Sequence, residues 1–126
     1  HIIHLVSKVQ GKLPSDGLAP QIMSDTFPAG TLSGAPKFRA MQILDENEKI
    51  RRGHYGGCVG FFGFNGDAVF AIMIRSFLSM KNTLVYQAGM GVVNDSNPEA
   101  EVEEVTAKLR ALRLAMKRAE ELSEGL

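Results

Sequence analysis

The chain has 126 residues, an apolar fraction of 44% and equal numbers of basic and acidic side chains, 14 of each. A balanced charge argues against a nucleic-acid binder and against an electrostatic membrane anchor, because both need excess positive charge. The single cysteine, Cys58, excludes an internal disulfide, and no apolar run approaches the length of a membrane span. We therefore expect a cytoplasmic protein with one unit of ordinary domain size.

The first segment alternates apolar and polar side chains with a period of two, which predicts a strand over residues 3–8. The chain begins at His1, without a methionine, so this strand would start almost at once. A native N-terminus rarely begins inside an element. We therefore expect a cut edge, with an N-terminal portion of the same domain lying outside the sequence.

The next segments are rich in turn residues. Residues 11–25 contain Gly, Pro, Ser and Asp and leave room for a short helix near 19–23. Residues 27–36 hold two prolines and two glycines, which predicts a loop. A helix is expected from about Pro36, since proline suits the first helical position, with Phe38, Met41 and Leu44 on its apolar face. Residues 45–53 are charged and expected to be exposed.

The middle of the chain predicts three strands, over residues 55–65, 68–80 and 83–93. Asn65-Gly66 and Lys81-Asn82 separate them as two-residue turns, because these residue types tolerate positive φ. Consecutive strands joined by tight turns form an antiparallel meander. With the helices on either side, the expected fold class is α+β, an antiparallel sheet with flanking helices.

A long helix is predicted over residues 98–122. Asp95-Ser96-Asn97-Pro98 supplies capping side chains followed by proline. Apolar residues then recur at spacings of three and four: Val102, Val105, Leu109, Leu112, Met116 and Ala119. The stripe indicates a helix packed on a sheet. The alternative is a partner helix in another chain, which would make this a non-catalytic interaction domain.

Glu101, Glu104 and Lys108 share one flank of that helix. Two carboxylates one turn apart suit a hard cation such as Mg²⁺, and a lysine one turn further on suits a substrate anion. Acidic first turns are also common simply because acids favour a helix N-terminus. Spacing alone leaves both readings open.

Other candidates lie in or next to the strands. Arg75 follows an apolar run and suits a carboxylate, or it is a strand-end arginine facing solvent. Gly89 and Gly91 indicate a bulge or a close backbone approach to an anion. Tyr55 suits packing or a hydrogen bond, and His4 is either a structural histidine or a base.

Several of these segments, in order, resemble the motifs of the chorismate-utilising enzymes. The loop Pro-Ala-Gly-Thr-Leu-Ser-Gly-Ala-Pro-Lys, residues 28–37, resembles the signature loop in the form typical of the anthranilate synthase large-subunit family. Further segments resemble the family's His-Leu-x-Ser strand, Arg-Gly-Pro-Tyr-Gly-Gly turn, Ile-Ala-Ile-Arg strand, Ala-Gly-Ala-Gly strand and Glu-rich helix. They are residues 4–7, 52–57, 72–75, 88–91 and 95–108.

The resemblance implies roles for individual residues. Glu101 and Glu104 match ligands of Mg²⁺. Lys108, Arg75, Tyr55 and the backbone of Gly89 and Gly91 match groups that hold the carboxylates of chorismate. Matching positions also imply that Thr31 and Ser33 line the pocket, that Thr31 and His4 are catalytic, and that His4 moves a proton.

The resemblance also implies a fold and a reaction. The fold is a two-sheet α/β sandwich, of which residues 1–126 would be the C-terminal portion of the catalytic domain. Chorismate and ammonia would give anthranilate and pyruvate in tryptophan biosynthesis, with ammonia from a glutamine amidotransferase subunit. A family segment carrying a further metal-ligand glutamate is absent from the sequence, so we expect the isolated chain to be inactive.

The sequence departs from the family pattern at several positions, and related enzymes with other activities share most of its motifs. His54, Val69, Ser76 and Met90 stand where the family usually has proline, aspartate, threonine and alanine. Aminodeoxychorismate and isochorismate or salicylate synthases share most of the motif residues and are alternative activities. A sheet cut at its edge would also expose unpaired backbone and an apolar face, so the chain is expected to self-associate.

Overall fold

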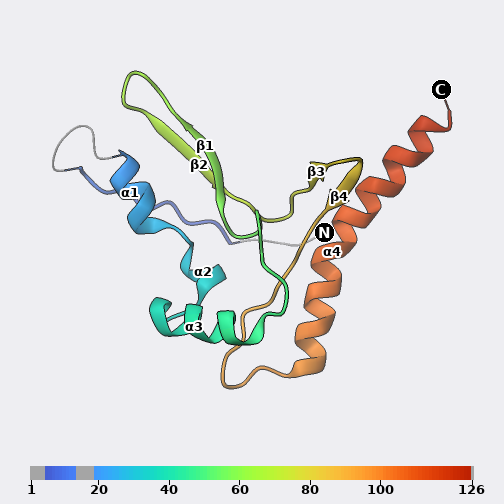
Figure 1. Cartoon of the computed structure of the whole chain (residues 1–126), viewed down its shortest axis with the longest axis horizontal. Helices are drawn as coiled ribbons and strands as arrows, with labels where there is room; N and C mark the ends of the chain where they lie inside the picture. The colour runs from blue at the N-terminus through green and yellow to red at the C-terminus, as the bar shows by residue number, and fades with distance from the viewer. Residues whose placement is uncertain (1–4, 14–18, 126) are drawn as a thin grey trace. The chain divides into compact units, whose positions relative to one another are not determined.

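The computed structural model describes residues 5–13 and 19–125, which form an α+β fold, as expected. The chain divides into two compact units, one reaching to Met73 and the other running from Ile74. The first contains helices α1 (Ala19–Thr26), α2 (Gly30–Ser33) and α3 (Lys37–Asn47) and strands β1 (Cys58–Phe62) and β2 (Ala68–Ile72). The second contains β3 (Leu78–Met80), β4 (Thr83–Val85) and the long helix α4 (Pro98–Ser123) (Figure 1). Each unit is described by itself below.

The predicted N-terminal strand is not present in its described part. Residues 5–13 form neither helix nor strand, and Leu5, Val6 and Val9 are almost fully exposed. Residues 3 and 4 of the predicted strand, and with them His4, lie outside the described residues. Alternation gives a segment a face to bury, but a strand also needs a neighbouring strand for its backbone groups, and residues 5–13 pair with no described strand.

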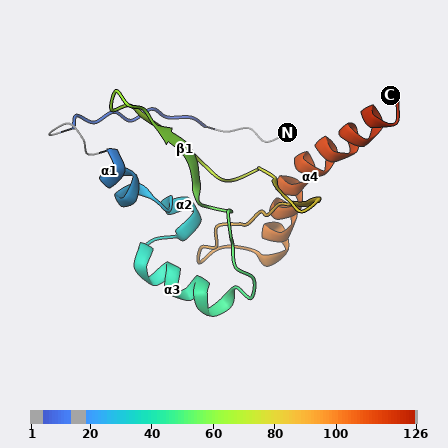
Figure 2. The same ribbon diagram turned by 45° about the horizontal axis from the view of Figure 1, so that its top comes forward.

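Three helices follow: α1 over Ala19–Thr26, α2 over Gly30–Ser33 and α3 over Lys37–Asn47. The predicted short helix therefore extends to Thr26, and the predicted loop contains one helical turn. Gly34 ends α2 with φ 89° and ψ 175°, a conformation open in practice only to glycine. A Cβ there would also lie 2.8 Å from the Cβ of Ala40, so Gly34 lets α2 pack directly on α3 (Figure 2).

Strands β1 (Cys58–Phe62) and β2 (Ala68–Ile72) form an antiparallel hairpin. Residues 63–67 connect them, so Asn65 and Gly66 lie in the turn as predicted, but the turn is longer than the two residues expected. The two faces of the hairpin differ. One carries Cys58, whose Sγ lies 3.9 Å from the Sδ of Met23 in α1. The opposite face presents Val59, Phe61 and Val69, each more than half exposed. We call these three residues the open face of the hairpin.

The prediction of one strand over residues 68–80 is wrong, and so is the three-stranded meander. β2 ends at Ile72, and a separate hairpin follows from β3 (Leu78–Met80) and β4 (Thr83–Val85). β2 ends because its partner, β1, offers no further residues to pair with. Met73 still bonds to the backbone of Gly56 and Gly57, but the chain before Gly56 is a turn and offers no further strand. Arg75 then bends the chain with φ 52°.

The last helix, α4, spans Pro98–Ser123, within one residue of the prediction. The side chain of Asn97 caps it by accepting a hydrogen bond from the backbone N–H of Ala100, and proline follows in the first turn. Leu112, in the middle of the predicted stripe, is the one buried hydrophobic residue in the described part of the chain. None of the described helices is long and apolar enough to span a membrane.

Candidate functional site

The signature loop is held by hydrogen bonds within itself, including one from the lysine at its end back to its first residue. Lys37 donates from Nζ to the carbonyl oxygen of Pro28 at 2.8 Å. Ser33 is only 4% exposed, and its hydroxyl donates to the carbonyl of Ala29 at 3.3 Å. Thr31 lies two residues earlier in α2 and is exposed. Thr31 is therefore open to a ligand, whereas the Ser33 hydroxyl is engaged within the loop.

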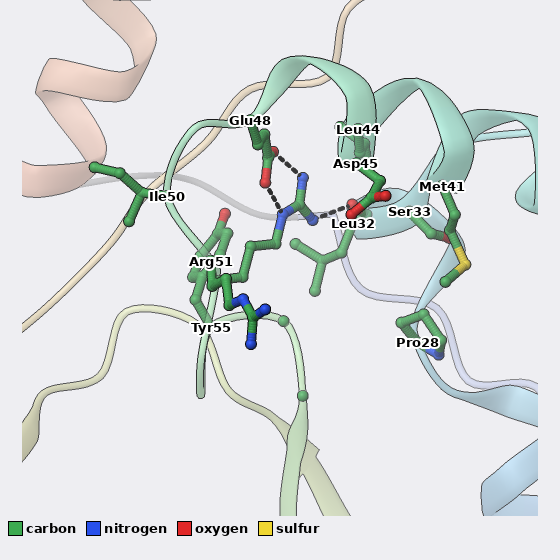
Figure 3. Close-up of a pocket in the computed structure, with 13 residues that line it drawn as sticks. Pro28, Leu32, Ser33, Met41, Leu44, Asp45, Glu48, Ile50, Arg51 and Tyr55 are labelled. Atoms are coloured by element: carbon green, nitrogen blue, oxygen red, sulfur yellow. Dashed lines mark hydrogen bonds and ion pairs between the residues drawn. The ribbon is translucent and has the colours of Figure 1, made fainter.

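Arg52 ties this loop to the end of α3. Its Nε and Nη2 donate to the two carboxylate oxygens of Glu48 at 2.8 and 2.5 Å, and its Nη1 donates to the carbonyl of Leu32 at 2.7 Å (Figure 3). The paired hydrogen bonds lower the pKa of Glu48 and raise that of Arg52. The guanidinium also lies 5.9 Å from the centre of the Tyr55 ring, within range of a cation–π contact.

These contacts surround a cavity of about 650 Å³. Tyr55 and Ser33, both predicted substrate-binding residues, line it, and Thr31 does not. We call it the signature-loop pocket; its other walls come from the same loop, from α3 and the segment after it, and from the turn before β1 (Figure 3). They are Pro28, Leu32, Met41, Leu44, Asp45, Glu48, Ile50, Arg51, Arg52, Gly56 and Gly57. The walls are mostly apolar, and the two arginines are balanced by Asp45 and Glu48, so the pocket suits a ligand with a largely apolar body.

A second group of predicted residues meets in the other unit, at the start of α4. Lys108 donates from Nζ to the carbonyl of Gly89 at 2.9 Å and pairs with Oε1 of Glu104 at 2.5 Å. The Lys108 side chain is 23% exposed and that of Glu104 is 53% exposed. The loop that carries Gly89 is thus fastened to the flank of α4, as spacing alone could not show. We call this group, with Glu101 and Ser96, the helix-start cluster.

Glu101 has one oxygen held and one free. Ser96 donates from Oγ to Oε1 at 2.7 Å, whereas Oε2 is buried and accepts no hydrogen bond from any described residue. A buried carboxylate oxygen without a partner is costly, and a cation would satisfy it. Proteins bind Mg²⁺ through one or two carboxylates and leave other positions to water or substrate. Glu101 and Glu104 fit that role.

The remaining predicted site residues, Arg75, Gly89 and Gly91, lie outside the helices and strands. Arg75 lies past the end of β2 and is exposed, and Gly91 is exposed with open space where a Cβ would lie. Gly89 and Gly91 lie in a loop, because β4 ends at Val85, so the predicted third strand to residue 93 is wrong. Within the described ranges no three His, Cys, Asp or Glu side chains gather into a metal-binding group.

The sequence does not single out Arg52 or Ser96 as functional residues. Arg52 occurs in it as the first residue of a family motif, and Ser96 as one of several residues able to cap a helix. Glu48 lies four residues before Arg52, but α3 ends at Asn47, so the pair forms across the segment that follows the helix and helical spacing does not predict it.

An α+β chain with this signature loop and an acidic helix-start cluster has the features of a chorismate-utilising enzyme. A family model described as chorismate binding enzyme matches residues 1–114, so the chain belongs to that family. The chain is 48% identical over its whole length to anthranilate synthase component 1 of Neisseria meningitidis serogroup A and of Acinetobacter calcoaceticus. Identity to the protein of that name from Mycolicibacterium smegmatis is 51% over 98% of the chain. The chain spans about a quarter of the length of these relatives.

Proposed function

We propose that this chain is part of the large subunit of a Mg²⁺-dependent anthranilate synthase, a lyase that acts on chorismate. The observation that carries the proposal is the helix-start cluster, in which Lys108 and the backbone of Gly89 meet beside two carboxylates. The chain that carries this cluster shares about half of its residues with relatives named anthranilate synthase component 1.

Each proposed role follows from the chemistry of the side chain. Lys108 offers an ammonium to a substrate carboxylate, which would displace Glu104 from it and free that carboxylate for a cation. Glu101 and Glu104 would hold Mg²⁺, which supplies Lewis-acid help to the departing ring hydroxyl. Arg75 is exposed and free to clamp a carboxylate, and the backbone of Gly91 approaches the substrate without a side chain. Tyr55 and Ser33, which line the signature-loop pocket, are proposed to contact the substrate, and the exposed Thr31 of the same loop is a proposed catalytic residue.

The proposed reaction consumes chorismate and ammonia and releases anthranilate, pyruvate and water. Ammonia adds at C2 of the ring as the C4 hydroxyl leaves. A base then takes the C2 proton while the enolpyruvyl group departs, gains a proton and becomes pyruvate. His4 is the proposed proton-transfer group, and it lies outside the described residues. A glutamine amidotransferase subunit is the proposed source of ammonia, in the cytoplasm.

The isolated chain is proposed to be inactive and to associate with itself. The described residues offer two carboxylates for a metal and gather no third. The open face of the hairpin exposes Val59, Phe61 and Val69 to water, a cost that association would remove.

A chimera tests the proposed activity. Residues 1–126 replace the matching quarter of the Neisseria meningitidis relative, and anthranilate fluorescence is followed with chorismate, ammonium and Mg²⁺. We expect turnover by the chimera and none by the chain alone. Lys108→Gln should raise the KM for chorismate by roughly tenfold or more, because a charged hydrogen bond is worth about 1.5–3 kcal/mol. Lys117→Gln is the matched control, because Lys117 is 72% exposed on the same helix.

Product identification separates the related activities. A non-aromatic aminated product, isochorismate or salicylate in place of anthranilate would contradict the proposal. So would a chimera that folds, as judged by circular dichroism, but leaves chorismate unchanged.

A further inference from the structure

Ser96 lies immediately before the cap of α4, but it does not cap the helix. The side chain of Asn97 accepts the bond from the Ala100 N–H that a helix start requires. The Ser96 hydroxyl instead donates to Oε1 of Glu101 at 2.7 Å. Because the cap is already provided, this second hydrogen bond needs another explanation.

The direction of the Ser96 bond is fixed by its other contact. The backbone N–H of Val93 donates to Oγ of Ser96 at 3.0 Å, so a lone pair of the hydroxyl is occupied. A hydroxyl has one proton, and here it points to Glu101. Ser96 thus connects the loop backbone at Val93 to one oxygen of the carboxylate, and the carboxylate cannot turn without breaking that bond.

The other oxygen of the same carboxylate is the unusual atom of the helix-start cluster. Oε2 of Glu101 is buried, and none of the described residues donates to it. A hydrogen bond that only stabilised the helix start would not require the second oxygen to stay unpaired. A hydrogen bond that aims a metal ligand would leave this oxygen free, because metal-binding carboxylates are themselves held by hydrogen bonds.

We propose that Ser96 is a positioning residue that holds Oε1 of Glu101 so that Oε2 is presented to a divalent cation. The inference rests on the proposed function, in which Glu101 is a ligand of Mg²⁺. Ser96 itself touches neither metal nor substrate. Its removal should weaken metal binding by about 10–100-fold, the range for hydrogen-bonding partners of metal ligands.

The experiment uses the chimera with Ser96→Ala, Ser96→Thr and Ser79→Ala. Ser79 is an exposed serine of β3 and serves as the matched control. Mn²⁺ binding is measured by electron paramagnetic resonance without substrate, and the Mg²⁺ concentration for half-maximal turnover is measured separately. We expect both constants to rise at least tenfold in Ser96→Ala and to recover largely in Ser96→Thr, which restores the hydroxyl.

The outcomes separate the two proposals. Unchanged Mn²⁺ and Mg²⁺ constants in Ser96→Ala would overturn the positioning role and leave the proposed function standing. Equal weakening in Ser96→Ala and Ser96→Thr would also overturn it, since the hydroxyl would not be the cause. A chimera that binds Mn²⁺ in a Ser96-dependent manner but makes no anthranilate would support the positioning role and contradict the proposed function.

Discussion

Removing the carboxylate of Glu48 should loosen the signature loop, because Arg52 would lose two of its three hydrogen bonds. The side chains of Arg52 and Glu48 are 29% and 38% exposed, so water screens the pair. Its paired geometry places it near the top of the range for such ion pairs, about 1 kcal/mol. Arg52→Ala also removes the bond to Leu32, worth about 1 kcal/mol, and should cost about 2 kcal/mol in total.

The pH dependence of this contribution follows from the direction of the pKa shifts. The pKa of Glu48 is lowered from its ordinary 4.5 by Arg52, so the stabilisation is complete well above pH 4.5. It is lost as the pH falls through the lowered pKa of the folded state. The pKa of Arg52 is raised, so the guanidinium remains charged across this range and only Glu48 titrates.

Urea unfolding of the chain measures the effect. The chain has two tyrosines, and in a Tyr86→Phe background Tyr55 alone reports on the unit that contains the signature loop. A double-mutant cycle of Glu48→Ala and Arg52→Ala should give a coupling energy of about 1 kcal/mol near neutral pH. The coupling should shrink in about 1 M salt and also as the pH is lowered below 4.5 through the lowered pKa of Glu48. A coupling that is absent at neutral pH, or that persists unchanged in acid, would refute the reasoning.

Three further predictions concern single elements. Asn97→Ala removes the cap of α4 and should lower its stability by about 1 kcal/mol, seen as a lower melting temperature at 222 nm; an unchanged transition would show the cap to be unimportant. Gly34→Ala should cost about 1–3 kcal/mol by urea unfolding, whereas Gly30→Ala, with open space at its Cβ, should cost less. Phe61→Lys charges the open face of the hairpin and should reduce light scattering at high concentration, unless association uses another surface.

Local signals in the sequence predicted the elements that depend on few residues. The cap, proline and apolar stripe predicted α4 to within one residue, because a helix satisfies its backbone within its own segment. The Lys81-Asn82 turn was predicted correctly, with positive φ at both residues, whereas the first hairpin was predicted in the right place but with too short a turn: residues 63–67 connect its strands and only Gly66 of the pair has positive φ.

Elements that depend on a partner were predicted poorly. The apolar run over residues 68–80 does not show where its neighbour turns away, so the break after Ile72 was missed. The same limit applies to the candidate site. Spacing placed Glu101, Glu104 and Lys108 on one flank, but the contacts to Gly89 and Ser96 come from loop residues whose distance in space the sequence does not encode.

Cys58 offers a way to observe how the first unit opens. It is the only thiol in the chain, it is half-buried, and its sulfur lies against Met23 of α1. Because Met23 covers part of the sulfur, a thiol reagent should reach it faster when α1 separates from the hairpin. The rate of labelling, compared with that of the urea-unfolded chain, therefore reports how far α1 protects it. The chain thus carries its own single-site reporter of the contact between α1 and β1.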